Sequence, residues 1–159
     1  MKPASLLQDK LVLVVDDEKD VLDSVAETLE MCTVHKVGDY ETALQYLLSY
    51  SYDIVVLDIM GVNGFELLKV AVKRGFPAVM LTAHALTPES LKKSIRLGAV
   101  SFLPKERMGD LVEHLEDVVL EAANRPGRSF STRWESFSIS ASGRIGEKRT
   151  GSSRNSRRN

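Results

Sequence analysis

Short apolar runs alternate with longer segments of helical spacing along the first 124 residues of the chain. Most positions within each run are apolar, many are β-branched, and polar residues do not alternate with them. Such runs are typical of strands buried on both faces, and therefore of a parallel sheet. We predict strands at residues 11–15, 33–37, 53–58, 78–82 and 100–103, of which 33–37 has the weakest pattern.

Between the runs, apolar residues recur every three or four positions, which is the spacing of amphipathic helices. Asp39 and Thr87 are predicted N-caps, Pro88 fits a first helical turn, and Gly75 and Gly98 are placed to end helices. The stripes comprise Val21, Leu22, Val25 and Leu29; Ala43, Leu44, Leu47 and Leu48; Phe65, Leu67, Leu68, Ala71 and Val72; and Leu111, Val112, Leu115, Val118 and Val119.

A strand followed by a helix, five times in succession, predicts a doubly wound α/β fold. Because crossovers between parallel strands are right-handed, the helices should cover both faces of the sheet. We place this domain at residues 9–124. The 159-residue chain is long enough for one such domain and a short additional segment.

The additional segment, residues 125–159, differs from the body in charge and pattern. It carries eight Arg and one Lys against two Glu, a balance of +7, whereas residues 1–124 have a balance of −8. Its Ser, Arg and Gly residues show no apolar periodicity, so we expect it to be mostly disordered and dispensable for folding. Phe130, Trp134 and Phe137 lie among the arginines, so binding of nucleic acid or an acidic surface is an alternative, although we expect a solvated tail.

Other features of the sequence concern the compartment. No apolar run is long enough to span a bilayer, and residues 1–8 lack the pattern of a signal peptide, so we expect no membrane insertion. The single cysteine, Cys32, cannot form an intramolecular disulfide, which fits a reducing cytoplasm.

Polar residues directly follow four of the predicted strands. Asp16 and Asp17 follow the first, Asp58 ends the third, Thr82 ends the fourth, and Lys105 lies just beyond the fifth. Since parallel strands end at the same edge of a sheet, these side chains should meet where such folds bind ligands. A single residue of this kind is more often a turn residue or a helix cap, so the prediction rests on the whole set.

Three carboxylates about 4 Å apart repel one another by roughly 4 kcal/mol per pair at an effective dielectric of ~20. A divalent cation would offset this repulsion. Carboxylate oxygens suit Mg²⁺, which retains several waters and leaves room for a substrate phosphate. With Lys105 and Thr82 on the other phosphoryl oxygens, Asp58 becomes the expected nucleophile, and an aspartyl phosphate is the expected product.

These residues resemble the response-regulator receiver family over about residues 9–124. The matching motifs are Val14-Val-Asp-Asp-Glu18, Asp58 after the third strand, Leu81-Thr-Ala83, and Lys105 with Phe102 three residues before it. The resemblance implies a flavodoxin-like fold with five parallel strands in the order 2-1-3-4-5. It also implies direct Mg²⁺ ligation by Asp17, Asp58 and the Met60 carbonyl, with Asp16 acting through water. Phe102 would be the switch aromatic, coupled to Thr82.

The function that the resemblance implies is that of a response regulator. A sensor histidine kinase or a phosphotransfer protein would supply the phosphoryl group to Asp58. The change in conformation would then control a downstream protein, and a phosphorylation-dependent dimer is compatible with this scheme. The chain would be a switch that catalyses only its own phosphorylation and dephosphorylation.

Two departures from the family pattern lie beside this site. Most family members reach a glycine eight residues after the phosphoacceptor and have a proline in that loop, whereas Gly64 comes six residues after Asp58 and the loop has no proline. Pro104 precedes Lys105 here, while many members have a proline after the lysine. In the family, the side chains at the positions of Met60 and His84 flank the approach of a hydrolytic water. We therefore expect both residues to tune the lifetime of the phosphorylated state.

Two alternatives come from other classes of protein. The first is a phosphatase that works through an aspartyl phosphate, but such enzymes usually carry a second Asp where this chain has Met60, which cannot transfer protons. The second is a DNA-binding regulator that uses the basic tail. His35 and His114 show no metal-ligand spacing, and we expect each to be an ordinary surface or edge histidine.

Overall fold

The computed structural model describes residues 4–83 and 87–124. The predictions for His84 and for the tail at 125–159 therefore lie outside the described residues. No helix in the described ranges is long and apolar enough to cross a lipid bilayer.

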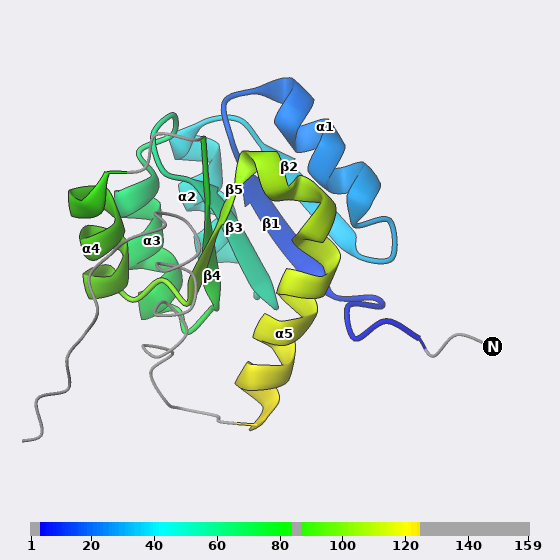
Figure 1. Cartoon of the computed structure of the whole chain (residues 1–159). Coiled ribbons are helices and arrows are strands. Elements are labelled where there is room, and N and C mark those ends of the chain that lie inside the picture. The colour runs from blue at the N-terminus through cyan, green and yellow to red at the C-terminus, as the bar shows by residue number, and fades with distance from the viewer. Residues whose placement is uncertain (1–3, 84–86, 125–159) are drawn as a thin grey trace, which may run out of the picture.

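Five parallel strands form one sheet in the order β2-β1-β3-β4-β5, as the resemblance implied (Figure 1). The strands are β1 (Leu11–Val15), β2 (Thr33–Val37), β3 (Ile54–Asp58), β4 (Ala78–Thr82) and β5 (Ser101–Pro104). Each apolar run of the sequence forms a strand, with bounds that differ by at most one residue from the predicted ones. The predicted flavodoxin-like fold is thus confirmed.

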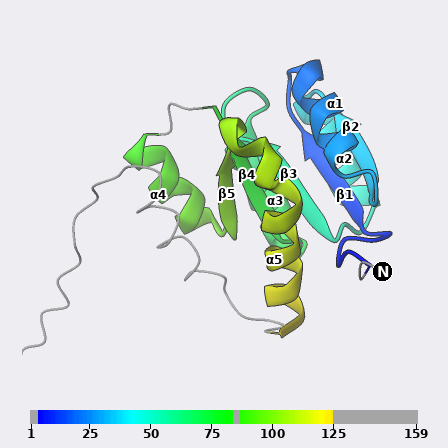
Figure 2. The same ribbon diagram turned by 45° about the vertical axis from the view of Figure 1, so that its right-hand side comes forward.

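Helices cover both faces of this sheet (Figures 1 and 2). They are α1 (Lys19–Thr28), α2 (Tyr40–Ser49), α3 (Gly64–Lys73), α4 (Pro88–Leu97) and α5 (Leu111–Asn124), with a short 3₁₀ helix, η1 (Lys105–Asp110), before α5. Helices α1 and α5 pack on one face, and α2, α3 and α4 on the other.

The predicted helix ends are confirmed by local hydrogen bonds and dihedral angles. The Thr42 N–H donates to the Asp39 carboxylate at the start of α2, and the Ser90 N–H donates to the Thr87 hydroxyl at the start of α4. Gly98 ends α4 with φ of 102°, a left-handed conformation that glycine adopts without strain. All peptide bonds within the described ranges are trans, Leu103–Pro104 included.

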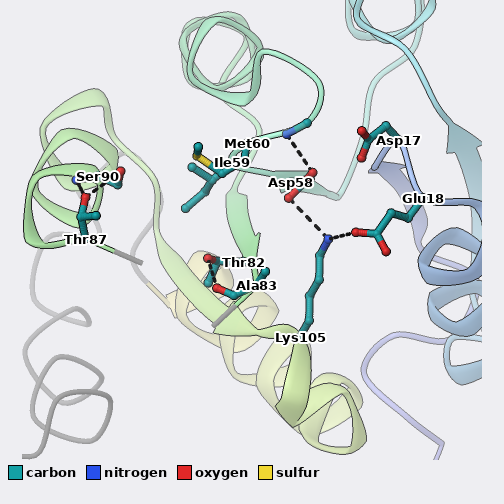
Figure 3. A pocket seen from close by; sticks show the side chains of 11 residues that line it. Asp17, Glu18, Asp58, Ile59, Met60, Thr82, Ala83, Thr87, Ser90 and Lys105 are labelled. Carbon is teal, nitrogen blue, oxygen red and sulfur yellow. Dashed lines mark hydrogen bonds and ion pairs between the residues drawn. The ribbon is translucent and has the colours of Figure 1, made fainter. Parts of the chain in front are cut away.

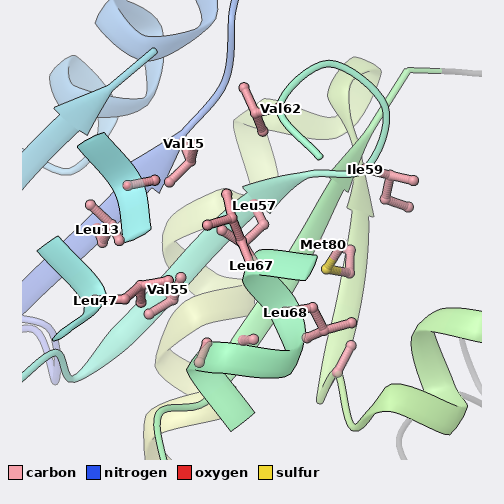
Figure 4. Packing of buried hydrophobic residues seen from close by; sticks show 14 of the residues in the cluster. Leu13, Val15, Leu47, Val55, Leu57, Ile59, Val62, Leu67, Leu68 and Met80 are labelled. Carbon is pink, nitrogen blue, oxygen red and sulfur yellow. The ribbon is translucent and has the colours of Figure 1, made fainter. Parts of the chain in front are cut away.

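The two faces of each strand bury different residues, which explains why the runs are apolar throughout. Leu13 and Val15 of β1 join a core beneath α2, α3 and α4, which Figure 4 shows, while Val12 and Val14 join a second core beneath α1 and α5. All four side chains are inaccessible to solvent. The second core also includes Leu7, so the packed structure begins upstream of the strands.

Candidate functional site

A cavity of about 360 Å³ lies at the carboxyl ends of the central strands (Figure 3). The loops after β1, β3 and β4 and the start of η1 supply its walls, together with the first turn of α4. Its lining contains four of the five residues that the strand ends were predicted to bring together. The lining residues are Asp17, Glu18, Asp58, Ile59, Met60, Gly61, Thr82, Ala83, Thr87, Ser90 and Lys105.

Asp58 is the last residue of β3 and is only 5% exposed. Its two carboxylate oxygens have different partners. Oδ2 accepts a hydrogen bond of 3.0 Å from the Gly61 N–H, and Oδ1 lies 3.6 Å from the Lys105 ammonium. The backbone of the following loop thus orients the carboxylate, while Lys105 compensates its charge.

Lys105 reaches across the cavity and contacts carboxylates from two strands. Its Nζ lies 2.9 Å from Asp16 Oδ2 and 3.3 Å from Glu18 Oε1, in addition to the contact with Asp58. Burial by itself lowers the pKa of Lys105, but the contact with Asp16 and the charges of Asp58 and Asp16 outweigh burial and raise it above the ordinary value. The ammonium therefore stays charged and lies between Asp58 and Glu18 (Figure 3).

Asp16 is the buried member of the acidic group and is inaccessible to solvent. Its Oδ1 accepts a hydrogen bond of 2.9 Å from the Glu18 N–H. Its Oδ2 lacks a hydrogen-bond donor in good geometry, although the Lys105 ammonium is close. Burial raises the pKa of Asp16, and the negative charge of Asp58 adds to the increase, while the Lys105 and Glu18 contacts oppose it.

The donor set fits a hard divalent cation. Carboxylate oxygens of Asp16, Asp17 and Glu18 all lie within 4.8 Å of one another. The Lys105 ammonium contacts Asp16 and Glu18, but a single positive charge leaves part of the repulsion among these carboxylates uncompensated. Oxygen ligands of this type are those that Mg²⁺ takes in proteins. Asp58, which the sequence placed among the metal ligands, lies across the Lys105 ammonium from Glu18 (Figure 3).

Thr82 and Phe102 lie on neighbouring strands but in different surroundings. Thr82 is 4% exposed, and its hydroxyl donates a hydrogen bond of 2.7 Å to its neighbour's carbonyl, that of Ala83. Phe102 is paired with Met80 across β4 and β5, is 1% exposed, and packs in the core beneath α2, α3 and α4. The phenyl ring is therefore separate from the cavity, while the Thr82 hydroxyl lines it.

The other predicted residues have different positions. The Met60 side chain lines the cavity mouth and is 78% exposed. His84 lies outside the described residues. His35 lies on the edge strand β2, as expected, and forms a hydrogen bond of 2.8 Å with Tyr52 among tyrosine rings. His114 in α5 forms one of 2.8 Å with Ser101 and is buried, so the prediction of a surface or edge histidine is wrong for this residue.

The sequence reasoning missed two residues of the site, Glu18 and Gly61. Glu18 contacts Lys105, and its place in the Asp-Asp-Glu run was a signal that it belongs to the acidic group. Gly61 gives its N–H to Asp58, and the short spacing between Asp58 and Gly64 was the only hint that this loop is unusual.

Comparison with known proteins agrees with this geometry. The family model described as the response regulator receiver domain matches residues 12–116. The chain belongs to this family. The receiver domain accounts for nearly all of the described residues, and the acidic group, Asp58, Thr82 and Lys105 all fall within the match.

Two curated relatives are about a third identical to this chain over the aligned receiver region. The regulatory protein VanRc of Enterococcus gallinarum is 37% identical in an alignment of 101 residues that covers 59% of this chain and 42% of the relative. The two-component response regulator ARR18 of Arabidopsis thaliana is 34% identical in an alignment of 100 residues that covers 59% of this chain and 16% of the relative. The match thus spans less than half the length of either relative.

Solved structures share the fold. A CheY-like response regulator receiver domain protein from Methanospirillum hungatei JF-1 superimposes with a TM-score of 0.67 at 23% identity, covering 74% of this chain and 98% of that one. NtrX from Brucella abortus superimposes with a TM-score of 0.61 at 27% identity, covering 74% of this chain and 29% of that one.

Proposed function

We propose that this receiver domain is a phosphorylation-controlled switch that accepts a phosphoryl group on Asp58 in a Mg²⁺-dependent reaction. The observation that carries the proposal is the convergence of Asp17, Asp58, Thr82 and Lys105 on one cavity. These residues lie at or just beyond the ends of four different strands, and a purely structural role would not require them to face the same space.

In the proposed reaction, a carboxylate oxygen of Asp58 attacks the phosphorus atom of the donor. An O–P bond forms as the bond from phosphorus to the donor breaks, and the donor leaves with the electron pair. Bound Mg²⁺ would offset the charge on the phosphoryl oxygens. Asp16, Asp17 and Asp58, with the Met60 carbonyl, would hold the ion, and Glu18 lies close enough to join them.

Lys105 and Thr82 would bind the transferred group. Lys105 already lies 3.6 Å from Asp58 Oδ1, so its ammonium can contact a phosphoryl oxygen attached there. The Thr82 hydroxyl would exchange its bond to the Ala83 carbonyl for one to another phosphoryl oxygen. That exchange would move the loop after β4 and alter the packing of Phe102, and so the surface of α4, β5 and α5. Such a charge event biases a two-state element.

The partners follow from this chemistry. A sensor histidine kinase or a phosphotransfer protein would donate the phosphoryl group in the cytoplasm, and a downstream protein would bind the altered surface. Met60 offers no proton transfer for repeated turnover, which supports a switch rather than a phosphatase.

The test is phosphorylation of the full chain with acetyl phosphate and Mg²⁺, followed by intact-mass measurement. Wild type should gain one phosphoryl group, and Asp58→Asn should gain none. Asp53→Asn is a matched control, because Asp53 precedes the opposite end of the same strand, where its carboxylate accepts a hydrogen bond from the Leu11 N–H. Equal labelling of Asp58→Asn and wild type would refute the assignment. Labelling that persists unchanged in EDTA would refute the role of Mg²⁺.

A further inference from the structure

The loop between β3 and α3 packs unusually tightly against the acidic group. Gly61 and Gly64 lie in the six-residue step that follows Asp58, and both are in close contact with atoms that a side chain would strike. The contact atoms differ in kind, and this difference separates the roles of the two glycines.

A Cβ atom on Gly61 would collide with the carboxylate of Asp17. It would lie 2.6 Å from Cγ and 2.7 Å from Oδ2, and closer still to Oδ1. Asp17 is exposed, and its carboxylate ends a short side chain that can rotate. A methyl group at position 61 would therefore turn the Asp17 carboxylate aside and leave the backbone in place.

Gly64 meets a different obstacle. A Cβ atom there would overlap the backbone carbonyl oxygen of Asp58 and approach Ile59 Cα to 3.1 Å. Backbone atoms cannot rotate away, so a side chain at Gly64 would disturb the end of β3 itself. Gly64 is needed for the loop to fold, whereas Gly61 is needed only by the side chain beside it.

We propose that Gly61 is a positioning residue for the cation site, because its missing side chain provides the space that the Asp17 carboxylate occupies. The inference rests on the proposed function, in which Asp17 is a Mg²⁺ ligand. The shortened loop brings Gly61 over Asp17. A side chain at position 61, which would be harmless in an open loop, would therefore weaken metal binding here. The Gly61 N–H, which holds Asp58 Oδ2 at 3.0 Å, is a backbone group and survives a change of side chain.

The experiment compares Gly61→Ala with Gly109→Ala in the full chain. Gly109 has an ordinary backbone conformation and open space where the Cβ of an alanine would lie, so alanine there controls for the loss of glycine alone. Mg²⁺ affinity is measured by calorimetry, and melting temperature is measured in EDTA. Gly61→Ala should bind Mg²⁺ about tenfold more weakly, the scale of an outer-shell change, with little change in melting temperature, while Gly109→Ala should bind like wild type.

A double-mutant cycle with Asp17→Ala tests whether Gly61 acts through Asp17. In the Asp17→Ala background, Gly61→Ala should cause no further loss of Mg²⁺ affinity. The Gly61→Ala single variant should accept a phosphoryl group at saturating Mg²⁺ as wild type does. An additive loss, or wild-type affinity in Gly61→Ala, would overturn the role of Gly61 and leave the metal site intact. If wild type itself binds no Mg²⁺, the metal assignment falls, and this inference falls with it.

Discussion

The two sides of the cavity belong to elements that differ greatly in how much of their surface is buried. The carboxylate side comprises Asp16, Asp17 and Glu18, which directly follow β1, and Asp58, which ends β3. The chain continues from β3 into α3, which buries Gly64, Leu67, Leu68 and Ala71. The hydroxyl side, which comprises Thr82, Thr87 and Ser90, lies on β4 and α4. Helix α4 has the same length as α3 but buries only Ser94.

This difference suggests that the two sides of the cavity have different roles. Groups that must hold a charge cluster in a fixed geometry need a rigid support, because small displacements of charged ligands change their interaction strongly. A group that reports a change needs an element that can move at low free-energy cost, and a helix with little buried surface is such an element. The carboxylate side thus suits chemistry, and the hydroxyl side suits the response.

The largest expected contrast is in the free energy of unfolding. Leu68→Ala in α3 removes a side chain with no exposure and should lower this free energy by about 3 kcal/mol. Leu91→Ala in α4 removes a partly exposed side chain and should lower it by about 1 kcal/mol. Urea unfolding of both variants measures the difference. Equal losses would show that α4 is as firmly packed as α3.

The next effect concerns the charge of Asp16. Because the folded pKa lies above the ordinary value of 3.8, the folded state retains the proton more strongly, and the protein loses stability as pH rises through the interval between the two values. In EDTA at pH 7, Asp16→Asn should therefore raise the free energy of unfolding, because the amide does not carry the buried negative charge that the folded state disfavours.

Melting curves from pH 4 to pH 8, with EDTA and with Mg²⁺, measure this effect. The advantage of Asp16→Asn over wild type should grow as pH rises in EDTA, and Mg²⁺ should stabilise wild type more than the variant. A variant that melts below wild type in EDTA at neutral pH would contradict the raised pKa.

The next prediction concerns the residues that cap the starts of α4 and α2. Thr87→Ala removes the hydroxyl that accepts from the Ser90 N–H and should cost about 1 kcal/mol, as should Asp39→Ala at the start of α2. Because α4 is loosely packed, we expect faster hydrogen exchange in Thr87→Ala to be confined to α4. Exchange that also accelerates in β4 and β5 would show that α4 unfolds together with the sheet.

The smallest effect concerns the lifetime of the phosphorylated state. Met60 is 78% exposed at the cavity mouth, and its thioether offers only a weak acceptor to a hydrolytic water. Met60→Asn supplies an amide that can orient water, so phosphoryl loss after donor removal should accelerate about threefold. His84→Ala serves as the comparison. A change in rate only in His84→Ala would assign control of hydrolysis to that residue.

The local signals in the sequence determined much of the fold. Five apolar runs without alternation predicted buried parallel strands, and the cap residues Asp39 and Thr87 marked helix starts, because these signals depend on neighbours within a few residues. The convergence of Asp17, Asp58, Thr82 and Lys105 was also predictable, since it follows from strand direction alone.

Only the tertiary structure decided how these groups interact. Lys105 contacts Asp16 and Glu18, although at least 87 positions of sequence separate it from them. The burial of Asp16 likewise depends on strands and loops that pack around it from distant parts of the sequence. The contact of Gly61 with Asp17 depends on the path of a loop, which spacing alone does not specify. The physical reason is that pKa, steric clearance and helix anchoring depend on atoms brought together by packing, while hydropathy and capping patterns report only the nearest residues along the chain.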